Sequence, residues 1–217
     1  MFTSFDIKEE AFWMAPHPIT KQYSGKNLPE KTDVLVVGSG YTGMVAALKL
    51  KNAGLDVTLL EKGRMGSEAS AKNGGMVLTG LSVSLFKVFK KFGQDKLARF
   101  FQESLESIDC VEALVKEGDI NCHFNRCGHL EAAFKPAHYE GLKHEQDFLA
   151  SRLNHTTRLI PPDKMQNELG SDFYHGGLLD PKSAGVHPAK YIAGLVRMAD
   201  AAGVDLHEQV EALKIER

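Results

Sequence analysis

Three glycines near the start of the chain have the spacing G-x-G-x-x-G: the segment reads Gly38-Ser39-Gly40-Tyr41-Thr42-Gly43. Each glycine has a physical task. Gly38 permits a tight turn, Gly40 lets the backbone approach a pyrophosphate, and Gly43 lets a helix and a strand pack closely. The helix that follows would present unpaired N–H groups and the positive end of its dipole to phosphates. The pattern therefore predicts a dinucleotide-binding turn, provided that a strand precedes it and a helix follows.

An acidic residue, Glu61, ends an apolar run about 20 residues further on and is followed by Lys62. A carboxylate at this place can accept hydrogen bonds from both hydroxyls of a ribose and would repel a 2′-phosphate, which favours FAD or NAD over NADP. The alternative is a glycine-rich turn with a surface glutamate. We favour the dinucleotide site because strand, turn, helix and acid occur in the required order.

Periodicity supplies that context and predicts an α/β fold. Residues 34–37 form an apolar run that predicts a strand buried on both faces, residues 41–53 have a helical pattern, and residues 55–61 predict a second buried strand. These three elements make a βαβ unit with parallel strands. Further on, the pattern predicts helices at 86–91, 94–117, 136–152, 161–169 and 188–202, a strand pair within 122–134, a strand at 173–181, and one or two strands after 203.

The composition argues against several kinds of binding partner and cellular location. The 217 residues are 43% hydrophobic and 25% charged, with a formal net charge of −2 and no basic block, which argues against nucleic acid or an anionic membrane as partner. The first residues lack the apolar core of a secretory signal, and no apolar run approaches the roughly 20 residues of a membrane span. Three cysteines, an odd number, suggest free thiols. The sequence predicts a cytoplasmic protein.

The loop after Glu61 separates FAD from NAD. An NAD-dependent dehydrogenase would be expected to continue with further alternating strands and helices. This chain instead continues with a loop of small and polar residues: Glu68-Ala69-Ser70-Ala71-Lys72-Asn73-Gly74-Gly75. The loop resembles the G-A-S-G-R-N-G-G segment of the D-amino-acid-oxidase-like family of FAD-dependent oxidoreductases, and in particular its gamma-glutamylputrescine oxidoreductase-like amine and amino-acid oxidoreductases. Glu68 replaces a glycine of that pattern and Lys72 replaces an arginine, which keeps the charge but loses the planar fork.

A second segment, residues 176–208, resembles the family's strand, G-x-x-x-P helix start and following strand. The resemblance implies that the loop runs under the flavin and that the last strand gives main-chain contacts to the adenine. It therefore implies FAD-binding roles for one further set of residues: Ser70, Lys72, Asn73, Gly74, Gly75 and Ala212.

The resemblance also implies a domain plan. An N-terminal arm (1–29) precedes a Rossmann-like FAD-binding domain (30–118 and 184–217), which is interrupted by the start of an antiparallel substrate-domain sheet (119–183). The implied reaction oxidises the C–N bond of a small amine or amino acid. Hydride passes from the α-carbon to flavin N5, and water hydrolyses the imine. The sequence identifies no catalytic base, and it leaves the electron acceptor open between oxygen and a quinone.

Two other functional hypotheses are weighed against this one. Family members are longer than this chain, so one alternative is a truncated FAD-fold fragment with no turnover of its own. That reading predicts exposed sheet edges and exposed apolar surface, for example around Leu178 and Leu179. The other is an NAD-dependent dehydrogenase, which the loop disfavours.

Other groups of reactive residues receive structural interpretations. A cysteine and histidine cluster suggests zinc, but the C-x₄-C spacing is unusual and no second pair follows, so we predict no metal site. The cluster comprises Cys122, His123, Cys127 and His129. His187 stands before Pro188, where a helix should begin, and is assigned to that start. Four phenylalanines are assigned to the core rather than to a substrate cage: Phe86, Phe89, Phe100 and Phe101.

Overall fold

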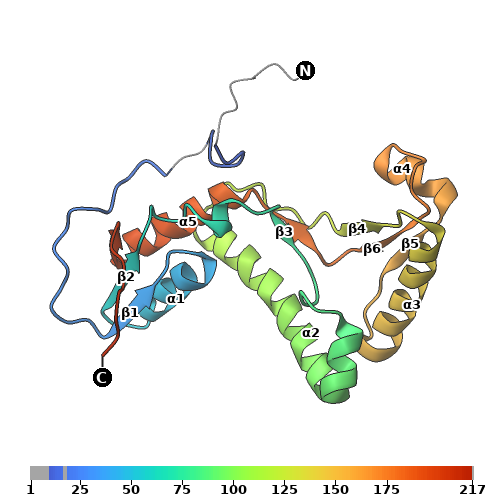
Figure 1. The fold of residues 1–217 in the computed structure, drawn as a ribbon, viewed down its shortest axis with the longest axis horizontal. Helices are drawn as coiled ribbons and strands as arrows, with labels where there is room; N and C mark the ends of the chain where they lie inside the picture. The colour runs from blue at the N-terminus through green and yellow to red at the C-terminus, as the bar shows by residue number, and fades with distance from the viewer. Residues whose placement is uncertain (1–9, 17–18, 217) are drawn as a thin grey trace. The chain divides into compact units, whose positions relative to one another are not determined.

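A computed structural model describes residues 10–16 and 19–216 (Figure 1). The chain divides into two compact units. Unit 1 holds the described residues of 1–75, 114–123 and 186–217, and unit 2 holds 76–113 and 124–185. These boundaries differ from the predicted FAD and substrate domains, whose functional assignment stays a prediction.

Unit 1 is built on a parallel sheet with the strand order β1-β2-β8. The strands are β1 (Val34–Val37), β2 (Val57–Glu61) and β8 (Asp205–Glu208), and all three run parallel. In Figure 1 the blue β1 and the red C-terminal strand belong to this one sheet, with β2 between them. Every residue of β2 is buried, as its apolar sequence predicted. The predicted βαβ unit is confirmed.

The prediction for β1 was wrong in one respect, because this strand is not buried on both faces. Leu35 is 50% exposed and Val37 is 59% exposed, and they alternate with half-buried neighbours. Leu35 and Val37 share one face of the strand, and that face is open to solvent, whereas β8 at the other edge of the described sheet is largely buried. Four consecutive apolar residues do not reveal whether a strand is central or peripheral.

Helices α1 (Tyr41–Asn52) and α5 (Pro188–Ala201) pack against each other in unit 1. Helix α1 follows the glycine turn and contacts both β2 and α5. Helix α5 buries an extensive apolar face that includes Ile192, Leu195 and Val196. His187 is its N-cap residue, with Nδ1 accepting from the Lys190 N–H, which confirms the structural interpretation of this histidine. The short helix η1 (Ala69–Ala71) completes the unit.

Unit 2 contains an antiparallel sheet with the order β4-β6-β5. Its strands are β4 (His129–Ala132), β5 (Arg158–Ile160) and β6 (Gly177–Asp180). Helix α3 (Pro136–Leu153) packs on this sheet through a core of Ala133, Leu142 and Leu178. A small ladder pairs β3 (Met76–Val77) with β7 (Ala184–Gly185). The other helical segments are α2 (Leu85–Glu117, interrupted at Gly93), η2 (Pro162–Lys164) and α4 (Met165–Leu169).

Two sequence-based expectations fail outside the βαβ unit. Residues 122–134 do not form a strand pair: β4 pairs with the distant β6, and Asn125 makes an isolated bridge to Gly185. The separation of this sheet from the β1 sheet is confirmed. Leu178 is only 6% exposed because α3 covers it. After residue 203 the described chain forms one strand, β8, within the predicted one or two.

The phenylalanines that were assigned to the core are not all buried. Phe101 is 3% exposed, as a core residue should be, but Phe86 is 61% exposed. Within the described ranges, none of the helices has the length and apolarity required to cross a bilayer.

Candidate dinucleotide site

The glycine turn has the geometry that its sequence predicted. Gly38 follows β1 with φ +99°, a value that side chains rarely tolerate, and its N–H donates to the Leu60 carbonyl over 2.8 Å. A Cβ added to Gly43 would overlap the Gly38 carbonyl oxygen and lie 3.3 Å from Val36 Cγ1. Gly43 is therefore required by the close approach of α1 to the end of β1.

The N-terminus of α1 is suited to an anion. Its N-cap residue is Gly40, which has no side chain to cap the helix, and its first turn contains no acidic residue. Ser70 Oγ accepts from the Tyr41 N–H at 3.1 Å. A Cβ on Gly40 would lie 3.1 Å from the same hydroxyl, so the missing side chain lets the loop approach the turn. Backbone donors at a helix N-terminus and the absence of competing acids fit a pyrophosphate.

Glu61 ends β2 and is bound to this turn. Its side chain is largely buried, with the residue 8% exposed. Oε2 accepts from the Ser39 N–H at 2.9 Å and from Ser39 Oγ at 2.7 Å, and Oε1 accepts from the Gly63 N–H at 2.8 Å. Burial alone would raise the pKa of Glu61, but the hydrogen bonds from Gly63 and Ser39, together with the charge of Lys62, lower the pKa below its ordinary value. The carboxylate is thus held ionised.

These contacts limit the number of hydrogen bonds that Glu61 can accept from a ribose. A carboxylate has about four acceptor positions, and protein donors use three on Glu61. One position on Oε1 remains. A bidentate contact to two ribose hydroxyls therefore requires a donor such as Ser39 Oγ to rotate away. Ser39 also accepts from the Gly66 N–H at 2.8 Å, so its hydroxyl links the acid to the following loop. The role of Glu61 as ribose anchor stays a prediction.

The loop after Glu61 is ordered by its own polar side chains. Asn73 donates to the carbonyls of Ala69 and Ser70, each at 3.0 Å, and its Oδ1 accepts from the Gly75 N–H at 2.8 Å. Gly75 has φ +71°, and a Cβ there would overlap the carbonyl oxygen of Val186. The loop is therefore a shaped segment beside the α1 N-terminus rather than a spacer.

The structure brings together only part of the predicted site. The glycine turn, Glu61, Ser70, Asn73 and Gly75 are connected by the contacts above. The remaining predicted residues Lys62, Lys72, Gly74 and Ala212 are all exposed. Lys72 pairs with Glu68 over 3.3 Å, and Ala212 lies in the irregular segment beyond β8. Their contacts to a cofactor stay predictions.

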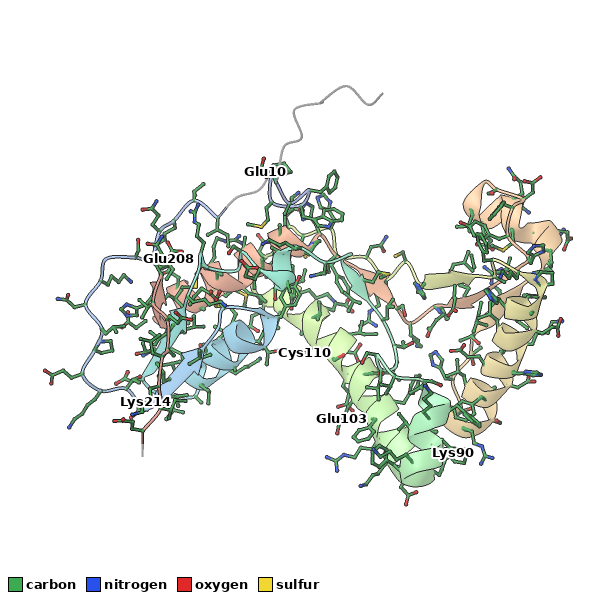
Figure 2. The ribbon with its side chains drawn as sticks, viewed as in Figure 1. Glu10, Lys90, Glu103, Cys110, Glu208 and Lys214 are labelled. Carbon is green, nitrogen blue, oxygen red and sulfur yellow. The ribbon has the colours of Figure 1, made fainter. Side chains whose placement is uncertain are left out.

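One residue that sequence analysis missed is Glu208, labelled in Figure 2. It ends β8 in register with Glu61 and is 4% exposed. Its Oε1 accepts from the Tyr23 N–H at 3.1 Å and its Oε2 from the Met65 N–H at 3.0 Å. It therefore fastens both the N-terminal segment and the start of the loop to the sheet. The signal in the sequence was a second acid at the end of a predicted strand.

The cysteine and histidine cluster is divided between the units. Cys122 and His123 belong to unit 1, whereas Cys127 and His129 belong to unit 2. His123 Nε2 lies 2.7 Å from Lys190 Nζ. In the part of the chain that the structure describes, no three metal-ligating side chains come together, and the three cysteines form no disulfide.

Comparison with known proteins identifies the family. The family model for FAD dependent oxidoreductases matches residues 33–217. The chain is 32% identical to a probable oxidoreductase OrdL of Haemophilus influenzae over 181 residues, which are 83% of this chain and 42% of that protein. It is also 32% identical to gamma-glutamylputrescine oxidoreductase of Escherichia coli over 162 residues, 75% of this chain and 38% of that protein. The chain thus spans less than half the length of these relatives.

Solved structures show the same fold. Glycine oxidase from Geobacillus kaustophilus matches 85% of this chain and 48% of its own, with 21% identity and a TM-score of 0.73. L-amino acid deaminase from Proteus vulgaris, with a deleted insertion sequence, matches 92% of this chain and 51% of its own, with 20% identity and a TM-score of 0.70. Taken with the family match over most of its length, this places the chain in the family of FAD-dependent oxidoreductases.

Proposed function

We propose that this chain supplies the FAD-binding part of an oxidoreductase that acts on an amine or amino acid. The observation that carries the proposal is the N-terminus of α1, whose N-cap residue Gly40 has no side chain, beside a glycine turn and a buried, ionised glutamate. The family's cofactor is FAD. The substrate class is taken from relatives named for gamma-glutamylputrescine, glycine and L-amino acids.

The chain's own residues would bind and orient the cofactor. The N–H groups at the start of α1 that follow Tyr41 would hold the pyrophosphate, since the Tyr41 N–H already donates to Ser70. Glu61 would accept from the ribose through the free position on Oε1. Ser70 and Asn73 would keep the loop beside the turn. When bound, FAD supplies the hydride acceptor for oxidation of a C–N bond.

The proposed reaction is the oxidation of an amine to an imine. Hydride would leave the α-carbon of an unprotonated amine, and the resulting imine would be hydrolysed by water. No residue of this chain is assigned as general base. The electron acceptor stays open between oxygen and a quinone, and a cytoplasmic location stays a prediction.

The alternative to turnover is a chain that only binds FAD. The two functions share the cofactor site and differ in activity.

The test is titration of the purified chain with FAD, NAD and NADP, followed by flavin absorbance and fluorescence. We expect saturable binding of FAD and much weaker binding of both nicotinamide dinucleotides. Preference for NAD would contradict the assignment of the site. Reduction of bound flavin by glycine or putrescine under anaerobic conditions would then support turnover, whereas bound but unreduced flavin would support the second function.

A further inference from the structure

The start of α2, in unit 2, carries a local excess of positive charge. Residues 78–100 contain five basic residues and one acid, Asp95. The basic residues are Lys87, Lys90, Lys91, Lys96 and Arg99. The whole chain has a formal net charge of −2, and the prediction against an anionic membrane rested on that total. The total charge does not describe this segment.

Three of these lysines have no acid to neutralise them. Arg99 pairs with Glu103 over 2.9 Å. Within the described ranges no acid pairs with Lys87, Lys90 or Lys91, and all three are exposed. Lys87 and Lys91 are four residues apart, so their ammonium groups share one face of the helix and repel each other. An external anionic surface would replace that repulsion with attraction.

A bend in α2 presents an aromatic ring among these charges. Gly93 interrupts the helix with φ +79° and ψ −179°, and nothing lies within 4 Å of a Cβ built there. Figure 2 labels Lys90 at the same end of α2. Phe92, just before the bend, is 43% exposed. Lys91 Nζ and Lys96 Nζ, from the two sides of the bend, lie 5.0 Å and 5.5 Å from the centroid of its ring. The bend therefore holds an open aromatic ring between two ammonium groups.

Exposed apolar side chains continue this surface towards the N-terminus. Leu81 and Val83 are exposed in the segment before α2, and Phe86 is exposed on its first turn. Phe86 and Lys90 are four residues apart and share one face of the helix. The Phe86 ring meets Phe148 edge-on, with 6.0 Å between the ring centroids, and still leaves most of its surface to water. Covering these side chains with an apolar medium is favourable.

We propose that this part of unit 2 docks on an anionic lipid bilayer. The basic-aromatic surface consists of Phe86, Lys87, Lys90, Lys91, Phe92 and Lys96. Its ammonium groups would lie at the level of anionic headgroups, and its two rings would enter the boundary between headgroups and acyl chains. Lysines alone would suit a nucleic acid, and phenylalanines alone would suit a protein groove. Both together on one short helical segment fit a lipid surface, because it supplies negative charge and an apolar layer in one partner.

The test is co-sedimentation of the full chain with lipid vesicles of two compositions. One is phosphatidylcholine alone, and the other contains about one third phosphatidylglycerol. We expect the partition coefficient to be about 100-fold higher on the anionic vesicles, from about 5-fold per unpaired lysine, and most of that gain to disappear at about 0.5 M NaCl. Equal partition onto both vesicles, or no sedimentation with either, would overturn the proposal. FAD is absent from the assay, so its outcome is independent of the cofactor proposal.

A triple variant locates the contact. Lys87→Gln, Lys90→Gln and Lys91→Gln combined should remove most of the preference for anionic vesicles. The control variant removes the same charge by replacing three other exposed lysines with glutamine: Lys31, Lys49 and Lys135. The control should keep nearly the full preference. Equal losses in the two variants would show that overall charge, not the basic-aromatic surface, attracts the lipid, and would overturn the proposal.

Insertion of the rings distinguishes a bilayer from other polyanions. In Phe86→Trp, we expect the added fluorescence to shift to shorter wavelength on anionic vesicles, measured against the parent chain, whose single tryptophan is Trp13. The absence of a shift would contradict ring insertion and overturn the lipid assignment. Duplex DNA is the competing polyanion. Complete displacement of the chain from the vesicles by DNA at equal charge concentration would assign the surface to nucleic acid instead.

Discussion

The carboxyl ends of β2 and β8 carry the same residue in matched positions, but the two glutamates hold different parts of the chain. Glu61 accepts three hydrogen bonds, all from Ser39 and Gly63, which belong to the glycine turn and the residues just after the strand. Glu208 accepts from the N–H groups of Tyr23 and Met65. Glu61 thus stabilises one local turn, whereas Glu208 joins three distant segments.

The difference separates Glu61, the proposed cofactor residue, from Glu208, a scaffold residue. Glu61 is hydrogen-bonded to the glycine turn that precedes α1 and keeps one free acceptor position for a ligand. For Glu208, both oxygens accept from backbone amides that have no other role in the site. Removing Glu208 should therefore damage the fold first, and removing the charge of Glu61 should damage cofactor binding first.

The largest expected effect comes from the turn on which Glu61 depends. In Gly43→Ala the new methyl group would overlap the Gly38 carbonyl, so α1 and the end of β1 must separate. We expect a loss of about 3 kcal/mol or more in the free energy of unfolding, measured by urea denaturation. Gly141→Ala is the control, because nothing lies within 4 Å of a Cβ there and the residue is in α3. That variant should be stabilised by about 0.5–1 kcal/mol. Equal stability of the two variants would contradict the close packing.

Next in size is the loss of the scaffold acid. Glu208→Ala leaves the N–H groups of Tyr23 and Met65 without their acceptor, and we expect a loss of about 2–4 kcal/mol in unfolding free energy. Glu208→Gln keeps one oxygen and should lose about half as much. Glu211→Ala, at an exposed position three residues on, should change stability by less than about 0.5 kcal/mol. If Glu208→Ala were as stable as wild type but bound FAD more weakly, Glu208 would be a cofactor residue and not a scaffold residue.

The cofactor acid is tested by Glu61→Gln. Its amide oxygen can still accept from Ser39, but its NH₂ group then faces the Gly63 N–H, and the charge is lost. We expect FAD affinity to fall roughly 5- to 150-fold, or about 1–3 kcal/mol, in fluorescence titrations. Glu68→Gln removes an exposed acid from the same loop and should bind FAD normally. Unchanged affinity in Glu61→Gln would remove this residue from the site.

The same acid predicts a pH dependence. The pKa of Glu61 is lowered in the folded chain relative to its ordinary value of 4.5. Its contribution to stability is therefore present above that value and is lost as pH falls through the lower folded pKa. The stability difference between wild type and Glu61→Gln should shrink in acid. A constant difference between neutral and acidic pH would show that charge is not the cause.

The two glutamates also explain which features the sequence could predict. The strand, turn and helix around Glu61 are consecutive, so spacing alone placed Gly38, Gly43 and Glu61 correctly relative to one another. The partners of Glu208 are far away in the chain, and the pairing of β4 with β6 likewise joins distant segments. Local periodicity carries no information on such contacts, and for this reason the strand pair at 122–134 was wrong. The exposed face of β1 was missed because the covering of a strand's faces by other elements is also a long-range property.

The smallest expected effect belongs to Tyr23, on the Glu208 side of the comparison. Burial first, and then the charges of Asp200 and Glu208, raise the pKa of Tyr23 from 10.0 to about 12. A raised pKa means that the folded chain disfavours the phenolate. Stability from this group is therefore complete below pH 10 and is lost as pH rises towards 12. Tyr23→Phe removes both the titration and the 3.4 Å hydrogen bond from the hydroxyl to Asp200, which should cost only about 0.5 kcal/mol at neutral pH. Urea denaturation at pH 7 and at increasing alkaline pH should show wild type losing its small advantage over Tyr23→Phe. If the unfolding free energies of the two proteins fell equally at alkaline pH, another group would be titrating. The role of Glu208 would then be limited to accepting hydrogen bonds from the backbone.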